Sequence, residues 1–202
     1  MNDLPDDGDD YPNDMDMAAQ KSPNRDIGRI GENIVANEFI WRGFLVTHLD
    51  KGTRGVSANA DLLVMHPNKR EYPLLIQVKA CFAKAEPNWI FVGNLTDGII
   101  MGKDKMFNRK DGFDADILAA VAISNTKKYR VFIIPVGDAE RIIVEGFRKF
   151  LKIPKKNGEP KKVFALARIS LNLKSKTKKD MALHDTARKL LKYENAFGAL
   201  TV

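Results

Sequence analysis

The amino-acid sequence predicts an α/β protein in which a mixed central β-sheet is flanked by helices. An amphipathic segment at 22–42, followed by Gly43, has the apolar spacing and the end signal of a helix. Short runs rich in Leu, Val and Ile follow it. Two of these runs, at 117–123 and 129–135, are continuously apolar, which is typical of central strands covered on both faces. The alternation of such runs with helical patterns indicates a sheet with helices packed against it.

The individual elements can be assigned in order along the chain. Strands are predicted at 44–48, 61–66, 74–79, 89–92, 117–124, 129–135 and 163–173. Helices are predicted at 22–42, 138–152 and 181–196. The strands at 61–66 and 74–79 are separated by the polar segment 67–73, which contains Pro and Asn, so these two strands are predicted to form a β-hairpin.

Length and composition favour one domain. The chain has 202 residues, of which 44% are apolar, enough for one core at 22–202 after a short tail at 1–21. The single cysteine, Cys81, excludes a disulfide framework and is expected to be a small buried residue. We find no apolar run that could span a membrane and no signal-peptide pattern. We therefore expect a soluble, cytoplasmic protein with no membrane partner.

The net charge of +7 conceals a strong asymmetry. Residues 1–20 contain seven Asp and no Lys or Arg, which leaves 33 basic and 19 acidic residues, or +14, for residues 21–202. So basic a body is typical of a protein that binds a polyanion, although a soluble protein with many lysines would also have it. The acidic tail at 1–21 is too charged and too poor in apolar residues to pack, and is predicted to be disordered.

Basic loops supply the candidate contacts to nucleic-acid phosphates. The loop at 49–60 is polar with a basic segment at 52–55, the loops at 93–112 and 152–162 are basic, and a further basic cluster lies at 174–179. Loops of this kind suit the phosphate backbone, and no zinc-finger or helix-turn-helix signature points to base reading. The side chains that we expect to bind nucleic acid are Arg54, Lys103, Lys105, Arg109, Lys110, Lys155 and Lys156.

Polar residues at the ends of the predicted hairpin form the candidate site. Asp61 begins the first strand, and Gln77 and Lys79 lie near the end of the second. Because side chains alternate across a strand, Gln77 and Lys79 point to one face and Val78 to the other. The antiparallel pairing brings Asp61 close to this pair. Two oxygen ligands and an ammonium group at one edge of a sheet suit a hard divalent cation beside a phosphate.

The predicted helix at 22–42 carries a candidate second carboxylate, Glu32. It lies among the small residues Gly28, Gly31 and Ala36, which would let the helix approach the sheet closely and bring the Glu32 carboxylate near the hairpin. The alternative is a surface glutamate on an amphipathic helix.

These motifs resemble those of a known nuclease superfamily. Asp61 followed by Gln77-Val78-Lys79 resembles the core motif of the PD-(D/E)xK nucleases, closest to the branch with Gln at the middle position that includes Mrr-like restriction enzymes. The segment from Gly28 to Glu32, with Ala36, resembles the helix before the core in archaeal Holliday-junction resolvases. The resemblance covers roughly residues 25–136, and the helix, the hairpin and the later strand follow in the expected order. It implies a restriction-endonuclease-like core.

The resemblance implies a metal-dependent endonuclease that hydrolyses DNA, duplex or branched, with Mg²⁺ or Mn²⁺. Asp61 would be the central ligand, with the Gln77 amide oxygen, the Val78 carbonyl and Glu32, the last directly or through water. Lys79 would orient or deprotonate the attacking water, or stabilise the phosphate. A homodimer is expected, because two DNA strands must be cut.

One departure from the superfamily pattern leaves an alternative open. Gln77 stands where Asp or Glu is usual, so the site has one negative charge fewer and would hold Mg²⁺ more weakly. The alternative is a catalytically weak or inactive nucleic-acid-binding module of the same fold within a larger complex. A third possibility is a structural protein with a basic surface. Asp114 or Asp116, just before the strand at 117, would either orient Lys79 or mark a turn or helix cap; the turn is favoured.

Overall fold

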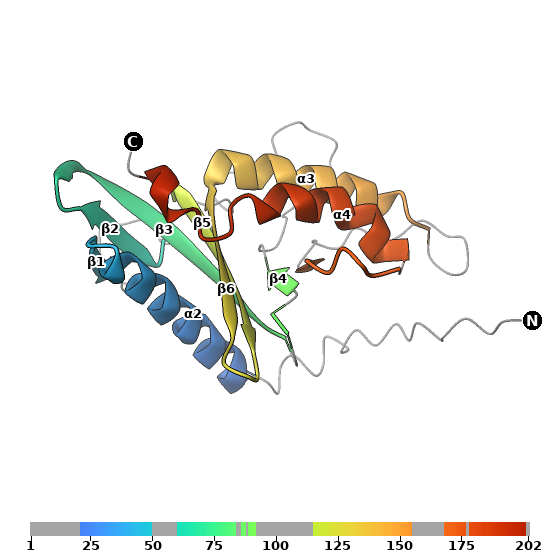
Figure 1. Ribbon diagram of the computed structural model, residues 1–202, viewed down its shortest axis with the longest axis horizontal. Helices are drawn as coiled ribbons and strands as arrows, with labels where there is room; N and C mark the ends of the chain where they lie inside the picture. The colour runs from blue at the N-terminus through green and yellow to red at the C-terminus, as the bar shows by residue number, and fades with distance from the viewer. Residues whose placement is uncertain are drawn as a thin grey trace, which may run out of the picture.

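A computed structural model of the chain describes residues 21–49, 60–83, 86–87, 89–91, 115–154, 168–176 and 178–200. The helices are α2 (Lys21–Trp41), α3 (Val136–Leu151), α4 (Lys178–Leu191) and the short 3-10 helix η1 (Ala196–Leu200). The strands are β1 (Leu45–His48), β2 (Leu62–His66), β3 (Lys69–Ala83), β4 (Trp89–Phe91), β5 (Ile117–Ser124), β6 (Tyr129–Pro135) and β7 (Arg168–Ser170). The protein is α/β, with a mixed five-stranded sheet flanked by helices, as predicted (Figure 1).

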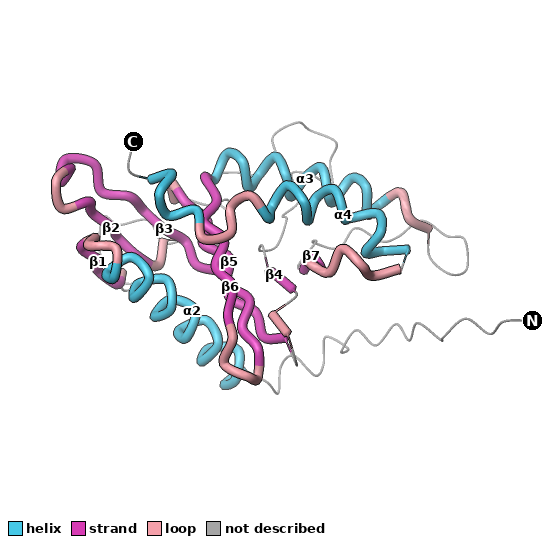
Figure 2. Tube along the Cα trace, viewed as in Figure 1, coloured by secondary structure: helices cyan, strands magenta, loops and turns pink. Residues whose placement is uncertain are grey.

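The main sheet has the strand order β1-β2-β3-β5-β6. Strands β1, β2 and β3 are antiparallel neighbours, β3 and β5 are parallel, and β5 and β6 are antiparallel. The predicted strands at 89–92 and 163–173 do not join this sheet. Their described residues contribute β4 and β7, which pair with each other in a separate two-stranded sheet (Figure 2).

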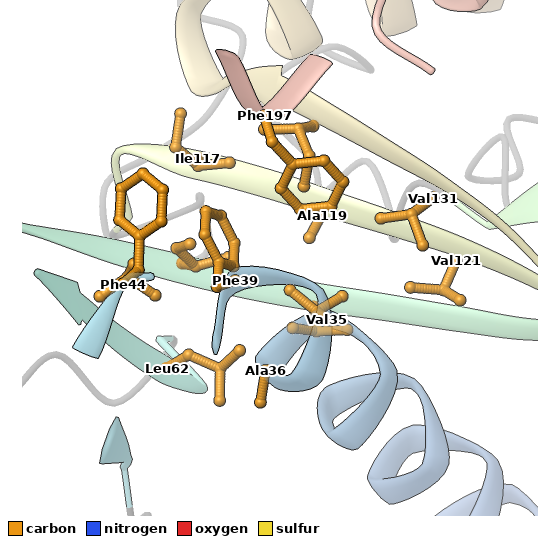
Figure 3. Packing of buried hydrophobic residues seen from close by; sticks show 14 of the residues in the cluster. Val35, Ala36, Phe39, Phe44, Leu62, Ile117, Ala119, Val121, Val131 and Phe197 are labelled. Carbon is orange, nitrogen blue, oxygen red and sulfur yellow. The ribbon is translucent and has the colours of Figure 1, made fainter. Parts of the chain in front are cut away.

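Each face of the main sheet is covered by a separate apolar cluster. On one face, Val35 and Phe39 of α2 pack with Val78 of β3 and with Val121 of β5, and Phe197 of η1 closes the cluster (Figure 3). On the other face, alternate residues of β5 and β6 pack against α3, α4 and the β4–β7 pair. Strand β5 is buried along its whole length, which confirms the prediction of a strand covered on both faces.

The hairpin between β2 and β3 is tighter than predicted. The turn was predicted to span 67–73, but β3 begins at Lys69, so Pro67 and Asn68 alone form the turn. The error came from Pro73, which usually argues against a strand. Pro73 is tolerated because β3 pairs with β5 only from Ile76 onward, so no neighbouring strand requires an N–H from position 73 on that side.

The described residues also bear on two predictions, the burial of Cys81 and the lack of a membrane-spanning segment. Cys81 is buried, as expected for a small core residue. Within the described ranges, no helix combines the length and the apolar character needed to cross a membrane. The acidic tail lies outside the described residues.

Candidate functional site

Strand β3 changes its partner in the middle. Its first half, Lys69 to Ile76, pairs with β2, and its second half, Ile76 to Ala83, pairs with β5 on the opposite side. Beyond Ile76, the side of β3 that faced β2 has no strand neighbour among the described residues. We call this side, from Val78 to Ala83, the open edge of β3.

Asp61 lies where the β2 ladder ends and the open edge begins. Its backbone N–H donates to the Ile76 carbonyl at 2.9 Å, and its side-chain Oδ2 accepts the Val78 N–H at 2.7 Å. Its own carbonyl accepts the N–H of Leu49, just after β1, at 2.9 Å. Asp61 is therefore fixed from both sides and bonds the two residues that flank Gln77.

The Val78 carbonyl points to the same edge as the Asp61 carboxylate. In a β-strand, the N–H and C=O of one residue point to the same side, and those of the next residue point to the other. Since the Val78 N–H reaches Asp61, its carbonyl oxygen also faces the open edge. Two oxygen atoms that could bind a cation, one from the Asp61 carboxylate and one from the Val78 carbonyl, thus lie at this edge.

Gln77, which lies between the two residues that Asp61 bonds, has an unpaired buried oxygen. Its side chain is only 7% exposed, and Oε1 accepts no hydrogen bond within the described structure. A buried polar atom without a partner is uncommon in folded proteins and often indicates that a water, an ion or a ligand completes the site. The Gln77 amide oxygen is free to serve as a ligand.

The orientation of Gln77 and Lys79 agrees with the alternation predicted from the sequence. Val78 belongs to the cluster on the α2 face, so Gln77 and Lys79 project to the opposite face. In the register with β5, Gln77 lies beside Leu118 and Lys79 beside Ala120, both in the cluster under α3 and α4. Lys79 is half-buried.

Helix α2 comes very close to the second half of β3 through Gly31. A Cβ atom at Gly31 would lie 2.5 Å from the Ala80 Cβ, a distance that real side chains do not adopt. The predicted role of small residues in this approach is confirmed for Gly31. It is wrong for Gly28, because a Cβ there would have no atom within 4 Å.

The close approach at Gly31 also determines where Glu32 lies. Glu32 is half-buried and follows Gly31 directly, so it is near the second half of β3. However, α2 covers the face of Val78 and Ala80, whereas Gln77 and Lys79 project to the other face. A Glu32 carboxylate would therefore have to approach these side chains around the open edge of β3. This relation between the two faces was not predicted from the sequence.

Asp116 makes a bond of the same kind as Asp61, at another place. Its Oδ2 accepts the N–H of Leu75 at 2.8 Å, and its own N–H donates to the Leu75 carbonyl at 2.8 Å. Leu75 lies four residues before Lys79 on the same strand. Asp116 thus joins the start of β5 to β3 from the bend that precedes β5, in line with the turn role that the sequence favours. Asp114 lies outside the described residues.

Asp61 supplies the one carboxylate among the candidate cation ligands at β3 and its open edge, in the described part of this site. No three side chains among His, Cys, Asp and Glu come together in the described part of the chain. The candidate oxygen ligands are the Asp61 carboxylate and the Val78 backbone carbonyl at the open edge, and the amide oxygen of Gln77, whose side chain projects to the face of α3 and α4. All three are hard oxygen ligands of the kind that Mg²⁺ and Mn²⁺ accept, so the residues present fit a weakly charged cation site.

The side chains predicted to contact nucleic acid belong to other parts of the chain. Their loops lie outside the described residues, and the residues concerned are Arg54, Lys103, Lys105, Arg109, Lys110, Lys155 and Lys156.

Comparison of the chain with protein-family models, with curated proteins and with solved structures finds no match.

Proposed function

We propose that this protein is an endonuclease that hydrolyses DNA phosphodiester bonds with a divalent cation held at the open edge of β3. The observation that carries this proposal is the buried, unpaired Oε1 of Gln77, a residue that lies in the chain between the two residues bonded by Asp61. An oxygen ligand of this kind, beside a carboxylate and a backbone carbonyl, is what a Mg²⁺ or Mn²⁺ ion requires from a protein.

The order of elements supports the same proposal. A helix with Gly31 and Glu32, a hairpin ending in Gln77-Val78-Lys79 and a later buried strand follow one another as they do in the PD-(D/E)xK nucleases. The later strand, β5, lies parallel to the half of β3 that carries the motif. We accordingly propose a restriction-endonuclease-like core, of the restriction or junction-resolvase type.

Each residue of the site has a role that follows from its chemistry. Asp61, the Val78 carbonyl and Gln77 would hold the cation, and Glu32 would contribute directly or through a water around the open edge. The bound cation would polarise the phosphate and lower the pKa of a coordinated water. Lys79 would hold the attacking water or neutralise charge on a phosphoryl oxygen. The Val78 N–H keeps Asp61 in place for this task.

A second candidate function rests on the weak charge of the site. Gln77 is neutral, and within the described residues no group of three His, Cys, Asp or Glu side chains comes together around Asp61. The protein would then bind DNA through its basic surface without cutting it. This is the module of a larger complex that the sequence also allows.

The test is cleavage of supercoiled plasmid and of a branched oligonucleotide, with Mg²⁺ and with Mn²⁺. Wild type should nick metal-dependently, and Lys79→Met should lose this activity because the charge beside the phosphate is removed. Lys192→Met is the matched control, since Lys192 is an exposed lysine after α4, against the ring of Tyr193. It should cut as wild type does.

Two other outcomes are informative. Wild type that binds DNA but never cuts it, with either metal, would favour the binding module. Wild type that neither binds nor cuts DNA at low salt would overturn both functions.

A further inference from the structure

Asp61 holds its carboxylate at the open edge of β3, whereas Gln77 projects to the face covered by α3 and α4. The Gln77 side chain is 7% exposed, and its Oε1 has no partner within the described structure. The helical carboxylate that the sequence offers, Glu32, lies on α2, which covers the opposite face. A carboxylate that meets Gln77 on its own face has to come from an element that covers this face. Among the described elements, these are α3, α4 and the β4–β7 pair.

Helix α3 begins beside the part of β3 that carries Gln77. The first N–H of α3 donates to the Asp116 carbonyl at 3.0 Å, and Asp116 exchanges two 2.8 Å bonds with Leu75, two residues before Gln77. In the register with β5, Gln77 lies beside Leu118, and Leu118 belongs to the same buried cluster as Ala139 in the first turn of α3. The beginning of α3 therefore lies over the end of the sheet at which Gln77 is placed.

One flank of α3 faces α4, which lies next to it in Figure 1. Two ion pairs join these helices: Glu145 with Lys189, and Lys149 with Asp185, the latter at 3.2 Å. Residues 193–195, which follow α4, lie against the outer side of β6. The flank of α3 that faces α4 is thus on the β6 side of the sheet.

Glu140 lies on the opposite flank of α3. It precedes Lys149 by nine positions (149 − 140), about two and a half turns of an α-helix, so the two side chains leave α3 in opposite directions. The sheet order β3-β5-β6 places β3 on the side of β5 away from β6. Since α4 is on the β6 side, the flank of Glu140 is on the side of β3, where Gln77 and Lys79 project.

The Glu140 carboxylate has no partner in the described part of the chain. It is half-buried, and no described residue bonds or pairs with it. Burial raises the pKa of the Glu140 carboxyl above its usual value, and no cationic side chain offsets this shift. The other acidic residues of α3 are paired, Asp138 with Arg141 and Glu145 with Lys149. A carboxylate that is partly withdrawn from water and unpaired is stabilised by a cation beside it.

We propose that Glu140 supplies a second carboxylate to the cation site, on the face where Gln77 provides only a neutral oxygen. With Asp61, the Val78 carbonyl and Gln77, it completes a set of hard oxygen ligands whose two negative charges match a divalent cation. Helix α3 thereby takes the role that the resemblance gives to Glu32 of α2. This inference rests on the proposed function, because it requires the cation at Asp61 and Gln77.

The first test is calorimetric titration of the full chain with Mn²⁺, without DNA. Glu140→Gln should lower the affinity for Mn²⁺ at least about tenfold, since it removes one of two ligand charges. Glu145→Gln is the matched control, because it removes the same charge from the flank of α3 that faces α4. It should bind Mn²⁺ as wild type does. Adding Gln77→Glu to Glu140→Gln should restore the wild-type affinity, because a carboxylate returns to the same face.

Thermal unfolding of the metal-free proteins separates a ligand from a structural residue. Glu140→Gln should unfold at the wild-type temperature or above it, since it removes a half-buried carboxylate that no described residue pairs with. A Glu140→Gln protein that unfolds at a lower temperature, or does not fold, would overturn the inference.

The titration also distinguishes the failure of this inference from the failure of the proposed function. If Glu140→Gln binds Mn²⁺ as wild type does while Asp61→Asn binds it more weakly, Glu140 is not a ligand and the proposed cation site stands. A wild type that binds no Mn²⁺ would overturn the proposed function, and this inference with it.

Discussion

In each half of β3, an aspartate side chain accepts a backbone N–H of the strand, but the two aspartates differ in their surroundings. At the point where β3 changes partner, each half has a backbone N–H that no strand accepts, and an aspartate accepts it instead. Asp116 takes the N–H of Leu75 at 2.8 Å, and Asp61 takes the N–H of Val78 at 2.7 Å. Both bonds stabilise the end of a ladder, so the bond alone does not identify a functional carboxylate.

The surroundings of the two carboxylates differ. Asp116 is exposed, and its carboxylate accepts the N–H of Leu75, which lies next to the apolar Leu74. Asp61 is half-buried beside Gln77 and faces the open edge, to which the Val78 carbonyl also points. The comparison teaches that a carboxylate suited to chemistry is recognised by the unsatisfied polar groups around it rather than by its own hydrogen bond.

The largest expected effect separates the two aspartates. Asp61→Asn and Asp116→Asn both keep an oxygen that can accept the strand N–H, but both lose the negative charge. Asp61→Asn should lower metal-dependent cleavage roughly 10²- to 10³-fold, because the charge that holds the cation is gone. Asp116→Asn should leave the activity within a few-fold of wild type. Initial rates of plasmid nicking measure both.

The same pair of variants has an internal control. Thermal unfolding should show that the two substitutions destabilise the fold by similar amounts, about 1 kcal/mol or less. If cleavage falls equally in both variants, the two halves of β3 do not differ in function, and Asp61 is a second structural cap.

The next effect concerns the helix that packs on the second half of β3. Gly31→Ala places a Cβ 2.5 Å from that of Ala80, and the helix must move. We expect the free energy of unfolding to fall by about 1–3 kcal/mol. Gly28→Ala is the matched control on the same helix: its Cβ meets no atom within 4 Å, and it should raise the stability by up to ~1 kcal/mol through helix propensity.

Urea unfolding followed by circular dichroism measures both glycine variants. Stabilisation by Gly31→Ala would show that α2 does not lie as close to β3 as described, and would remove the reason for placing Glu32 near the open edge.

The smallest effect tests the neutral ligand. Gln77→Glu restores the charge that the superfamily motif usually has, and should raise the affinity for Mn²⁺ about tenfold, since ligand charge governs the affinity of such sites. Gln77→Met removes the oxygen and should lower it. Calorimetric titration with Mn²⁺ measures both. If wild type, Gln77→Glu and Gln77→Met bind Mn²⁺ with equal affinity, Gln77 is not a ligand, and its unpaired oxygen is satisfied by something other than a cation.

Much of the fold could be predicted from local pattern. The helix at 22–42, the buried strands at 117–124 and 129–135 and the helix at 138–152 agree with the structure to within two residues, because periodicity and end signals are local properties. The start of β3 and the small sheet of β4 and β7 could not be predicted in this way. Pro73 in a strand is acceptable only where no neighbour needs its N–H. Strand β4 pairs with a distant segment, since Ile90 lies opposite Ile169, 79 positions later in the chain (169 − 90).

The sequence by itself determined the α/β class, the alternation that separates Gln77 and Lys79 from Val78, and the pairing of Asp61 with the end of the hairpin. These follow from hydrophobic period, turn chemistry and the geometry of a single strand pair. Only the tertiary structure decided that β3 exchanges β2 for β5 at Ile76, leaving an open edge beside Asp61. It also placed α2, with Glu32, on the face opposite to Gln77, and brought residues 193–195 against the outer side of β6. Such relations depend on which distant segments compete for the same strand edge and the same apolar face, and this competition is settled by the packing of the whole chain.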